Sequence, residues 1–363
     1  MNPKPQYVSV QALRAAAALL VVGAHLGDPK GFEAKIFGSN NLLGWLTEIG
    51  PTGVDLFFVV SGFIMTVTTQ RLASGVQPAG AFLLRRITRI YPCYVLLTGA
   101  IFAVYLWRPE LVNSSAAVRP DPLASFLLLP QEGLPLLLVG WTLVYEMFFY
   151  LIFAGSLLLK RSRLPLLVGA WVAVLVALQP VSAATSNAYI GLALSPLNIE
   201  FVLGIGLAML VLAGRIWAPR AAVIAGVMLL VAGTVVSGST VVDGITGGWL
   251  RVALVGIPMT LVLYGAVGGE LRHRWVPPRF LVQVGDASYS LYLVHVPVLS
   301  VVGIGLGMVA LDPALPVRVP VLTFAALTAV GGGFAFYVLV EKPLIGLVHD
   351  WAPKPRRATG HQP

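Results

Sequence analysis

The stretch LLLVGWTLVYEMFFYLIFAGSLL, residues 136–158, decides the fold class of this chain. It contains one formally charged side chain, that of Glu146, and is otherwise dominated by leucine, phenylalanine and other apolar residues. Because a helix rises about 1.5 Å per residue, a run of this length crosses the roughly 30 Å of hydrocarbon in a bilayer. The stretch therefore predicts a transmembrane helix.

Comparable apolar runs recur along nearly the whole chain of 363 residues. Hydrophobic residues make up 57% of the chain and charged residues 11%, whereas soluble domains contain about 25% charged residues. The mean hydropathy is +0.86. We predict an all-α, polytopic membrane bundle of about ten transmembrane helices, at 9–27, 53–71, 91–107, 136–158, 164–180, 195–213, 220–238, 249–268, 286–309 and 317–340.

The chain is predicted to contain one membrane domain, residues 1–345, followed by a cytoplasmic, disordered basic tail, residues 346–363. The tail includes WAPKPRRATGHQP, whose proline and basic residues suit contact with anionic lipid headgroups. Arg14 lies at the edge of the first apolar run, and the next run follows soon after. These features indicate a retained first helix rather than a cleaved signal peptide.

Basic residues indicate the orientation in the membrane. The formal net charge of +9 does not indicate nucleic-acid binding, because the basic residues lie singly or in short clusters between apolar runs. Of the 24 Lys and Arg residues, seventeen fall in one set of alternating loops and termini, and Arg14 lies in a span. The positive-inside rule therefore places both termini in the cytoplasm. The opposite set contains six residues, Lys30, Lys35, Arg108, Arg119, Arg251 and Arg318.

Cysteine usage and residue spacing restrict the chemistry further. Cys93 is the single cysteine, which excludes an internal disulfide and any CxxC metal or redox site. No cluster of His, Cys and Asp has the spacing of metal ligands, so we predict no metal cofactor.

Arg14 and His25 are ionisable residues of the first predicted helix. Each costs roughly 2.5–3.5 kcal/mol to insert, so such residues persist where they are paired, face water or act in function. Eleven residues correspond to about three helical turns, which places both side chains on one face. His25 could take a proton from a sugar hydroxyl as that hydroxyl attacks an acyl carbonyl. The alternative is a histidine hydrogen-bonded at the membrane interface.

Glu146 lies within the fourth predicted helix, with Trp141 and Tyr150 about one turn away on either side. A carboxylate inside a membrane is a functional candidate. It could orient His25 or bind a sugar hydroxyl, and the structural alternative is a partner for Arg14.

The second predicted helix begins with GVDLFFVVSGFIM, residues 53–65. Asp55 is a candidate substrate ligand or a helix cap. Ser61 could donate a hydrogen bond to a carbonyl or phosphate oxygen of a bound acyl donor. The alternative is a hydrogen bond to the backbone of its own helix. Gly62 would allow close approach of another helix.

Arg85, Arg86 and Arg89 form a basic cluster before the third predicted helix. Guanidinium groups bind phosphates in bidentate fashion, so the cluster suits a phosphorylated donor such as acyl-coenzyme A. The alternative is ordinary cytoplasmic charge.

The ninth predicted helix places Ser288, Tyr292 and His295 on one face, because they follow spacings of four and three. We predict a polar stripe there, with His295 as a structural or substrate-positioning residue rather than a second base. Tyr292 and His295 join Asp55, Trp141 and Tyr150 as candidate substrate contacts.

Six segments taken together resemble the membrane-bound acyltransferase family 3, in the family's order and across residues 10–345. Their wording is most similar to the exopolysaccharide-production O-acetyltransferase branch. The segments are LRAAAALLVVGAH (13–25), GVDLFFVVSGFIM (53–65), RRITRIYPCY (85–94), GWTLVYEMFFYL (140–151), GDASYSLYLVHVP (285–297) and VEKPL (340–344).

The resemblance implies an enzyme of the bacterial inner membrane that takes acyl groups from cytoplasmic acyl-CoA, above all acetyl-CoA. The acceptor implied is a carbohydrate hydroxyl of an exopolysaccharide or its lipid-linked precursor. His25 would be the catalytic residue and Arg14 its essential partner, while Glu146 would belong to the site. Arg86 and Arg89 would contact the donor.

Two other classes of function also use charges and aromatic residues inside the membrane. One is a transporter or flippase for a lipid-linked saccharide, and the other is an accessory membrane subunit of a polysaccharide synthase. A transporter would be favoured by broken helices in matched halves of the sequence, which we do not find.

Overall fold

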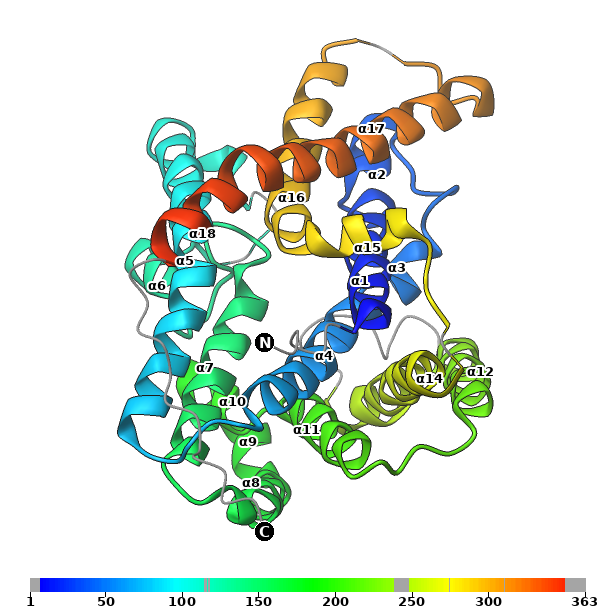
Figure 1. Ribbon diagram of the computed structural model, residues 1–363. Helices are drawn as coiled ribbons and strands as arrows, with labels where there is room; N and C mark the ends of the chain where they lie inside the picture. The colour runs from blue at the N-terminus through cyan, green and yellow to red at the C-terminus, as the bar shows by residue number, and fades with distance from the viewer. Residues whose placement is uncertain are drawn as a thin grey trace. The chain divides into compact units, whose positions relative to one another are not determined.

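The computed structural model describes residues 7–113, 116, 118–237, 248–273, 275–309 and 311–349. These residues form helices joined by turns and loops, and no strand occurs among them (Figure 1). The chain divides into two compact units. The first unit comprises Met1–Phe63 and Leu203–Tyr337, and the second comprises Ile64–Val202 and Val338–Pro363.

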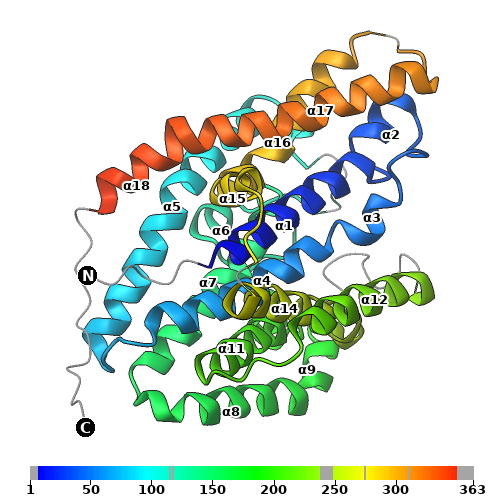
Figure 2. The same ribbon diagram turned by 45° about the vertical axis from the view of Figure 1, so that its right-hand side comes forward.

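The first unit is built around α1 (Val8–Gly27), which packs against several other helices of that unit. Figures 1 and 2 both show α15 lying beside α1. Ala15, Ala17 and Ala18 are buried on α1, and such small side chains let neighbouring helix backbones come close. The other elements are α2 (Phe32–Phe37), α3 (Leu46–Ile49), α12 (Pro219–Ser237), α13 (Gly248–Arg251), the π-helix η4 (Val252–Gly256), α14 (Ile257–His273), α15 (Arg279–Asp286), α16 (Ser288–Leu306) and α17 (Leu315–Phe336).

The second unit contains the long helix α5 (Val76–Trp107), which packs against α7 (Gly140–Leu157) and α18 (Lys342–His349). Phe149 is fully buried in this unit and stacks on Phe201 with 4.4 Å between ring centroids. The other elements wholly within this unit are η1 (Pro109–Leu111), α6 (Pro122–Leu127), η2 (Arg161–Arg163), α8 (Leu164–Ala177), α9 (Gln179–Ala184) and α10 (Ala188–Ala193). The boundary between the units falls within α4 (Thr52–Thr69), α11 (Asn198–Leu212) and the π-helix η5 (Tyr337–Glu341).

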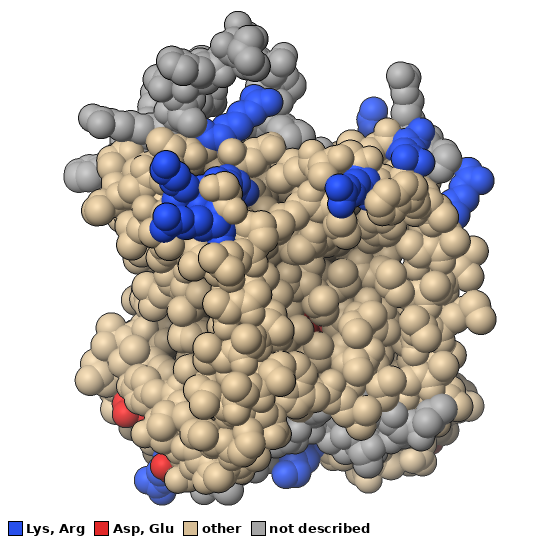
Figure 3. Space-filling view, turned by 90° about the horizontal axis from the view of Figure 1, so that it is seen from below, with Lys and Arg blue, Asp and Glu red and all other residues tan. Residues whose placement is uncertain are grey.

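The described part of the chain is helical, and the length and composition of its helices are those of a membrane protein. Among the described residues, 8 helical segments are long and apolar enough to cross a membrane. Figure 3 shows a face on which lysine and arginine side chains gather at the margins, while uncharged residues cover the broad area between them. The 8 segments are Val8–Phe37, Leu46–Thr69, Val76–Trp107, Gly140–Leu157, Ala188–Leu212, Gly248–Arg272, Ser288–Leu306 and Leu315–Leu347.

The predicted count of ten spans is not confirmed. The predicted span 164–180 is occupied by α8, whose 14 residues are about 21 Å long at 1.5 Å per residue. The predicted span 220–238 corresponds to the shorter apolar helix Pro219–Val235. Of the predicted tail, residues 346–349 belong to α18 and residues 350–363 lie outside the described residues.

Helix α5 begins much earlier than the predicted span 91–107, because it has 32 residues and starts at Val76. Hydropathy falls where Arg85, Arg86 and Arg89 occur, but arginine is a good helix former and the helix continues through it. The arginines therefore lie within the helix and do not precede it.

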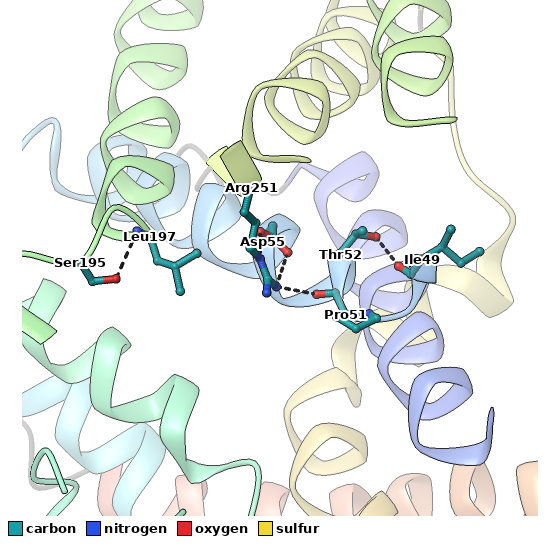
Figure 4. Close-up of polar contacts among 7 residues, drawn as sticks. All are labelled: Ile49, Pro51, Thr52, Asp55, Ser195, Leu197 and Arg251. Atoms are coloured by element: carbon teal, nitrogen blue, oxygen red, sulfur yellow. Dashed lines mark hydrogen bonds and ion pairs between the residues drawn. The ribbon is translucent and has the colours of Figure 1, made fainter. Parts of the chain in front are cut away.

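Two arginines that the charge count had placed in loops lie instead in buried ion pairs of the first unit. Figure 4 shows Arg251 on α13 reaching Asp55 on α4. Its Nε and one terminal nitrogen each lie 2.8 Å from a carboxylate oxygen of Asp55. Arg318 on α17 donates through one terminal nitrogen to the fully buried Glu33 at 3.1 Å and through the other to Ser39 at 3.2 Å. The charge count failed here because it treats a cation between apolar runs as exposed, whereas a buried carboxylate holds these two inside.

Glu33 also organises the segment after α1. Its carboxylate accepts hydrogen bonds from the backbone N–H groups of Leu42 and Leu43, at 3.0 and 2.8 Å. The Asn40 side chain donates to the carbonyl of Gly27, the last residue of α1, at 2.9 Å. Satisfied buried polar groups of this kind fix the path of a loop. The segment that follows His25 is therefore an ordered part of the first unit.

Gly204 on α11 lies against the backbone of α4, as expected from the small residue Gly62. A Cβ atom added at Gly204 would lie 2.0 Å from the carbonyl oxygen of Val59 and 3.0 Å from the Cα of Gly62. Both helices must shift to accept it. The close approach of a second helix at Gly62 is thus confirmed.

We expect Gly204→Ala to lower the thermal stability of the detergent-solubilised protein, because overpacking costs about 1–3 kcal/mol. Gly206→Ala is the matched control two residues along the same helix, where a Cβ would meet nothing within 4 Å. The control should be neutral or stabilising, since alanine exceeds glycine in helix propensity by about 1 kcal/mol. Equal melting temperatures for the two variants would contradict the close approach.

Candidate active site

The first unit brings together two histidines from opposite ends of the chain. His25 lies near the C-terminal end of α1, and His295 lies in the middle of α16. Their ring centroids are 4.9 Å apart in an edge-to-face arrangement. Nε2 of His295 is 3.4 Å from Nδ1 of His25. His295 is fully buried, while His25 is half-buried.

Aromatic rings complete the surroundings of this pair. Tyr292 lies one turn before His295 on α16, with 5.9 Å between the two ring centroids. Phe57 of α4 packs edge-to-face on Tyr292 at 5.8 Å. Ser288, the first residue of the same helix, is fully buried. The predicted face of Ser288, Tyr292 and His295 thus lies inside the first unit.

Arg14 lies on the same helix as His25, as predicted. Its side chain is half-buried and donates a hydrogen bond of 3.2 Å to the side chain of Gln11. The backbone of Gln11 lies against Gly285 of α15, where a Cβ would come within 1.9 Å of the Gln11 carbonyl oxygen. This close packing of α15 on α1 holds the helix turn that carries Arg14.

Asp55 and Ser61, the two polar candidates on α4, differ in their surroundings. Both carboxylate oxygens of Asp55 accept hydrogen bonds from Arg251, and the same arginine donates to the carbonyl of Pro51 at 3.3 Å (Figure 4). Ser61 is half-buried in the middle of α4. The geometry of Asp55 is that of a buried structural ion pair.

The second unit contains a separate polar cluster formed by α5 and α7. Arg86 of α5 lies over the rings of Phe82 and Tyr150, at 5.6 and 5.9 Å from their centroids. Tyr150 donates a hydrogen bond to Glu146, one turn earlier on α7. The Nε atom of Arg86 is buried and has no hydrogen-bond partner among the described residues. The cluster therefore holds a cation beside aromatic rings and a carboxylate.

The other candidates of the second unit lie on the same two helices. Arg85 is half-buried and Arg89 is exposed on α5. Trp141, in the first turn of α7, packs edge-to-face on Tyr145 with 6.0 Å between ring centroids. The contacts of the candidates thus lie within one unit or the other, and a partnership of Glu146 with His25 or Arg14 stays a prediction.

Several buried polar residues besides Arg251, Arg318 and Glu33 were not predicted from the sequence. Glu200 and Asn198 are fully buried at the start of α11. The Asn198 side chain donates to the carbonyl of Leu192 at 2.8 Å and so caps the end of α10. The signal was available, because a carboxylate at position 200 falls inside the predicted span 195–213.

Glu270 on α14 is another carboxylate whose role was not predicted from the sequence. It accepts hydrogen bonds from the backbone N–H groups of Val8 and Ser9, at 3.1 and 2.8 Å. A negative charge is favourable at a helix N-terminus. Burial raises the pKa of the neighbouring Tyr7 hydroxyl, and the charge of Glu270 adds to that rise. Glu270 therefore anchors the start of the helix that carries Arg14 and His25.

A family profile described as "Acyltransferase domain", for acyltransferase family 3, matches residues 7–338. The match includes both histidines, the arginines of α5 and Glu146. The chain belongs to this family. It is therefore an acyltransferase for groups other than aminoacyl groups, and its apolar helices make it an integral membrane protein.

Curated relatives of this acyltransferase agree with the family match. Exopolysaccharide production protein ExoZ of Rhizobium meliloti (strain 1021) is 36% identical over 332 residues, 85% of this chain and 94% of the relative. Acyltransferase MdmB of Streptomyces mycarofaciens is 26% identical over 391 residues, 98% of this chain and 96% of the relative. Peptidoglycan O-acetyltransferase OatA of Listeria monocytogenes is 29% identical over 167 residues, 41% of this chain and 24% of the relative. No solved structure matches the acyltransferase.

Among the described residues of the acyltransferase, no group of three or more His, Cys, Asp or Glu side chains is arranged to hold a metal ion. Cys93 is buried and carries a free thiol. The histidine pair of the first unit and the polar cluster of α5 and α7 contain imidazole, guanidinium, carboxylate and hydroxyl groups.

Proposed function

We propose that this enzyme is an O-acyltransferase that moves an acyl group, acetyl above all, from cytoplasmic acyl-CoA to a carbohydrate hydroxyl. The acceptor is an exopolysaccharide or its lipid-linked precursor, and the enzyme lies in a bacterial inner membrane with both termini in the cytoplasm. Two relatives are named for exopolysaccharide production and for peptidoglycan O-acetylation, which supports a saccharide acceptor. The observation that carries the proposal is the His25–His295 pair inside the helical first unit.

His25 acts as the general base in the proposed reaction. The acceptor hydroxyl attacks the thioester carbonyl, and its proton passes to the imidazole of His25. A new C–O bond forms and the C–S bond breaks. The coenzyme thiolate then takes the proton back from His25, so the enzyme returns to its starting state.

A base alone contributes about 10²- to 10⁴-fold in rate, so stabilisation of the thioester oxygen must supply more. Ser61 is the proposed group for that oxygen, because a group held in place before reaction costs no reorganisation when charge develops. Arg14 lies eleven residues, about 16 Å along α1, from His25 and donates to Gln11 in the preceding turn, so we propose that it contacts the arm of the coenzyme and not the reacting carbonyl. Its helix turn is fixed because Glu270 holds the N-terminus of α1 and α15 packs against it.

The arginines of α5 are the proposed donor site. Arg85, Arg86 and Arg89 follow one another on a single helix, so they present guanidinium groups toward one region. Phosphates of the coenzyme are suitable partners for the buried Nε atom of Arg86. Glu146 and Tyr150 hold the surroundings of that cation.

The acceptor contact that remains beside His25 in the proposal is Tyr292, because both ring nitrogens of His295 already face hydrogen-bond partners. Trp141 and Tyr150, on α7 of the second unit, stay a prediction as substrate contacts. Aromatic faces suit the apolar faces of sugar rings, and hydroxyl groups suit their polar edges. Asp55 is left out, because both of its carboxylate oxygens are taken by Arg251.

The test of this function is a single-turnover incubation of the purified enzyme with radiolabelled acetyl-CoA and lipid-linked saccharide from the producing cells. We expect label on the saccharide with the wild-type enzyme, and label that appears about 10²- to 10⁴-fold more slowly with His25→Ala. Movement of saccharide across vesicles without label transfer, with acetyl-, succinyl- and longer acyl-CoA donors, would instead favour a transporter.

We expect Arg86→Ala to raise the KM for acetyl-CoA by about 10- to 100-fold, because hydrogen bonds to charged groups contribute about 1.5–3 kcal/mol. Arg108→Ala is the matched control. Arg108 also lies over an aromatic ring, that of Trp107, but is exposed and pairs with Glu110. Steady-state kinetics at varied acetyl-CoA would detect the difference. An unchanged KM in a folded Arg86→Ala enzyme would remove Arg86 from the donor site.

A further inference from the structure

We propose that His295 is a positioning residue that holds His25 as the Nδ1–H tautomer, so that Nε2 of His25 is the atom that accepts the proton. This inference rests on the proposed function, because it specifies how His25 would serve as its base. It follows from three hydrogen-bond distances around the two rings.

The first distance concerns His25 itself. Nδ1 of His25 is 2.9 Å from the backbone carbonyl oxygen of Val21, one turn earlier on α1. A carbonyl oxygen only accepts hydrogen bonds, so Nδ1 must carry the hydrogen for this contact to be a bond. In a neutral imidazole the other nitrogen, Nε2, then keeps its lone pair.

The second distance determines the tautomer of His295 in the same way. Nδ1 of His295 is 3.1 Å from the carbonyl oxygen of Leu291, again one turn earlier on its helix. His295 therefore donates through Nδ1, and its Nε2 keeps a lone pair. His295 is fully buried, so it is held in the neutral form that these contacts describe.

The third distance joins the two rings. Nε2 of His295 faces Nδ1 of His25 at 3.4 Å. The Nε2 atom of His295 carries no hydrogen, so it can accept a hydrogen bond from Nδ1–H of His25. The Nδ1 hydrogen of His25 is therefore shared between the Val21 carbonyl and His295. In the opposite tautomer of His25, the lone pair of Nδ1 would face two acceptors, and both contacts would become repulsive.

The arrangement also suits the charged state of His25. When Nε2 takes the proton of the acceptor hydroxyl, Nδ1–H remains donated to Val21 and His295, so the ring has no need to turn. The proton on Nε2 then passes to the coenzyme thiolate as the C–S bond breaks. A histidine base is commonly oriented by a partner on its other nitrogen, and His295 is a neutral partner of this kind.

Substitutions at His295 test this role. His295→Leu removes the acceptor, and His295→Gln supplies an amide oxygen in its place. We expect His295→Leu to lower kcat by about 10- to 100-fold with little change in the KM for acetyl-CoA, as is usual for partners that orient a histidine. His295→Gln should recover most of kcat. The assay follows coenzyme A release from acetyl-CoA in the presence of the same lipid-linked saccharide.

Several outcomes would overturn the inference. If His295→Leu keeps kcat within about twofold of the wild type, or if a folded His295→Gln enzyme is as slow as His295→Leu, His295 does not position the base. Transfer by His25→Ala at near the wild-type rate would instead reject the base itself and with it the proposed mechanism. The two failures are thereby distinguished.

A spectroscopic measurement reads the tautomer without any substrate. In ¹⁵N-histidine-labelled enzyme in lipid nanodiscs, the signals of His25 are assigned by their loss in His25→Ala. We expect a protonated Nδ1 and a bare Nε2 in the wild type, and a mixture of tautomers in His295→Leu. A protonated Nε2 on His25 in the wild-type enzyme would contradict the proposal, even if the His295→Leu enzyme is inactive.

Discussion

Replacing His25 by alanine is expected to lower the single-turnover rate of acyl transfer by about 10²- to 10⁴-fold, the usual contribution of a positioned general base. The acceptor hydroxyl would then have to lose its proton to water, and the site would lose the imidazole that lies beside His295. Rapid-quench measurement of label moving from acetyl-CoA to the saccharide gives this rate directly. Binding of acetyl-CoA should change little, because the proposed donor contacts are on α5.

Two further variants separate loss of the base from loss of packing. His25→Asn keeps a side-chain N–H that can reach the Val21 carbonyl but has no basic nitrogen, so it should be as slow as His25→Ala. His273→Ala, at the last residue of α14, replaces another histidine and should transfer acyl groups at the wild-type rate. Transfer by the His25→Asn enzyme at near the wild-type rate would show that His25 is not the base.

Removing the carboxylate of Asp55 is expected to destabilise the protein by about 3–5 kcal/mol, because the buried Arg251 would lose the two carboxylate oxygens that compensate its charge. The side chains of the pair are 2% and 0% exposed, so water cannot replace the lost partner. Thermal denaturation of Asp55→Ala in detergent, followed by loss of the monodisperse peak in size-exclusion chromatography, measures the effect.

A double variant and a surface variant complete this test. Asp55→Leu combined with Arg251→Met replaces both charges with apolar groups, which is often neutral for a buried pair, so it should restore much of the stability. Glu110→Ala removes one side of the exposed Arg108–Glu110 pair, whose side chains are 57% and 61% exposed, and should change stability by less than about 1 kcal/mol. If Asp55→Ala were no less stable than Glu110→Ala, the ion pair would not stabilise the fold.

The sequence by itself determined the features that depend on short stretches of chain. Apolar runs such as 136–158 predicted a helical membrane protein, because crossing hydrocarbon requires a long apolar helix whose backbone groups are satisfied internally. Helical spacing likewise placed Glu146 beside Tyr150, and their hydrogen bond confirms that spacing. Six short segments in order were enough to predict the family, which the match over residues 7–338 confirms.

Helix ends were predicted less well than helix positions. The third helix was expected at residues 91–107, but α5 begins at Val76 because arginine lowers hydropathy without breaking a helix. The predicted span 164–180 contains α8, which ends at Ala177 after 14 residues. Hydropathy measures the preference of a segment for lipid, whereas helix length also depends on backbone propensity and caps.

Only the tertiary structure decided which polar residues meet. His25 and His295 are 270 positions apart, and Arg251 and Asp55 are 196 apart, so no local pattern connects them. From the sequence, Arg251 and Arg318 were predicted to be loop charges. The position of an arginine in the chain does not reveal whether a carboxylate on another helix pairs with it. Hydropathy describes each helix separately, whereas ion pairs and contacts between histidines depend on how the helices pack. The local pattern therefore determined the membrane helices, and packing determined the chemical partners.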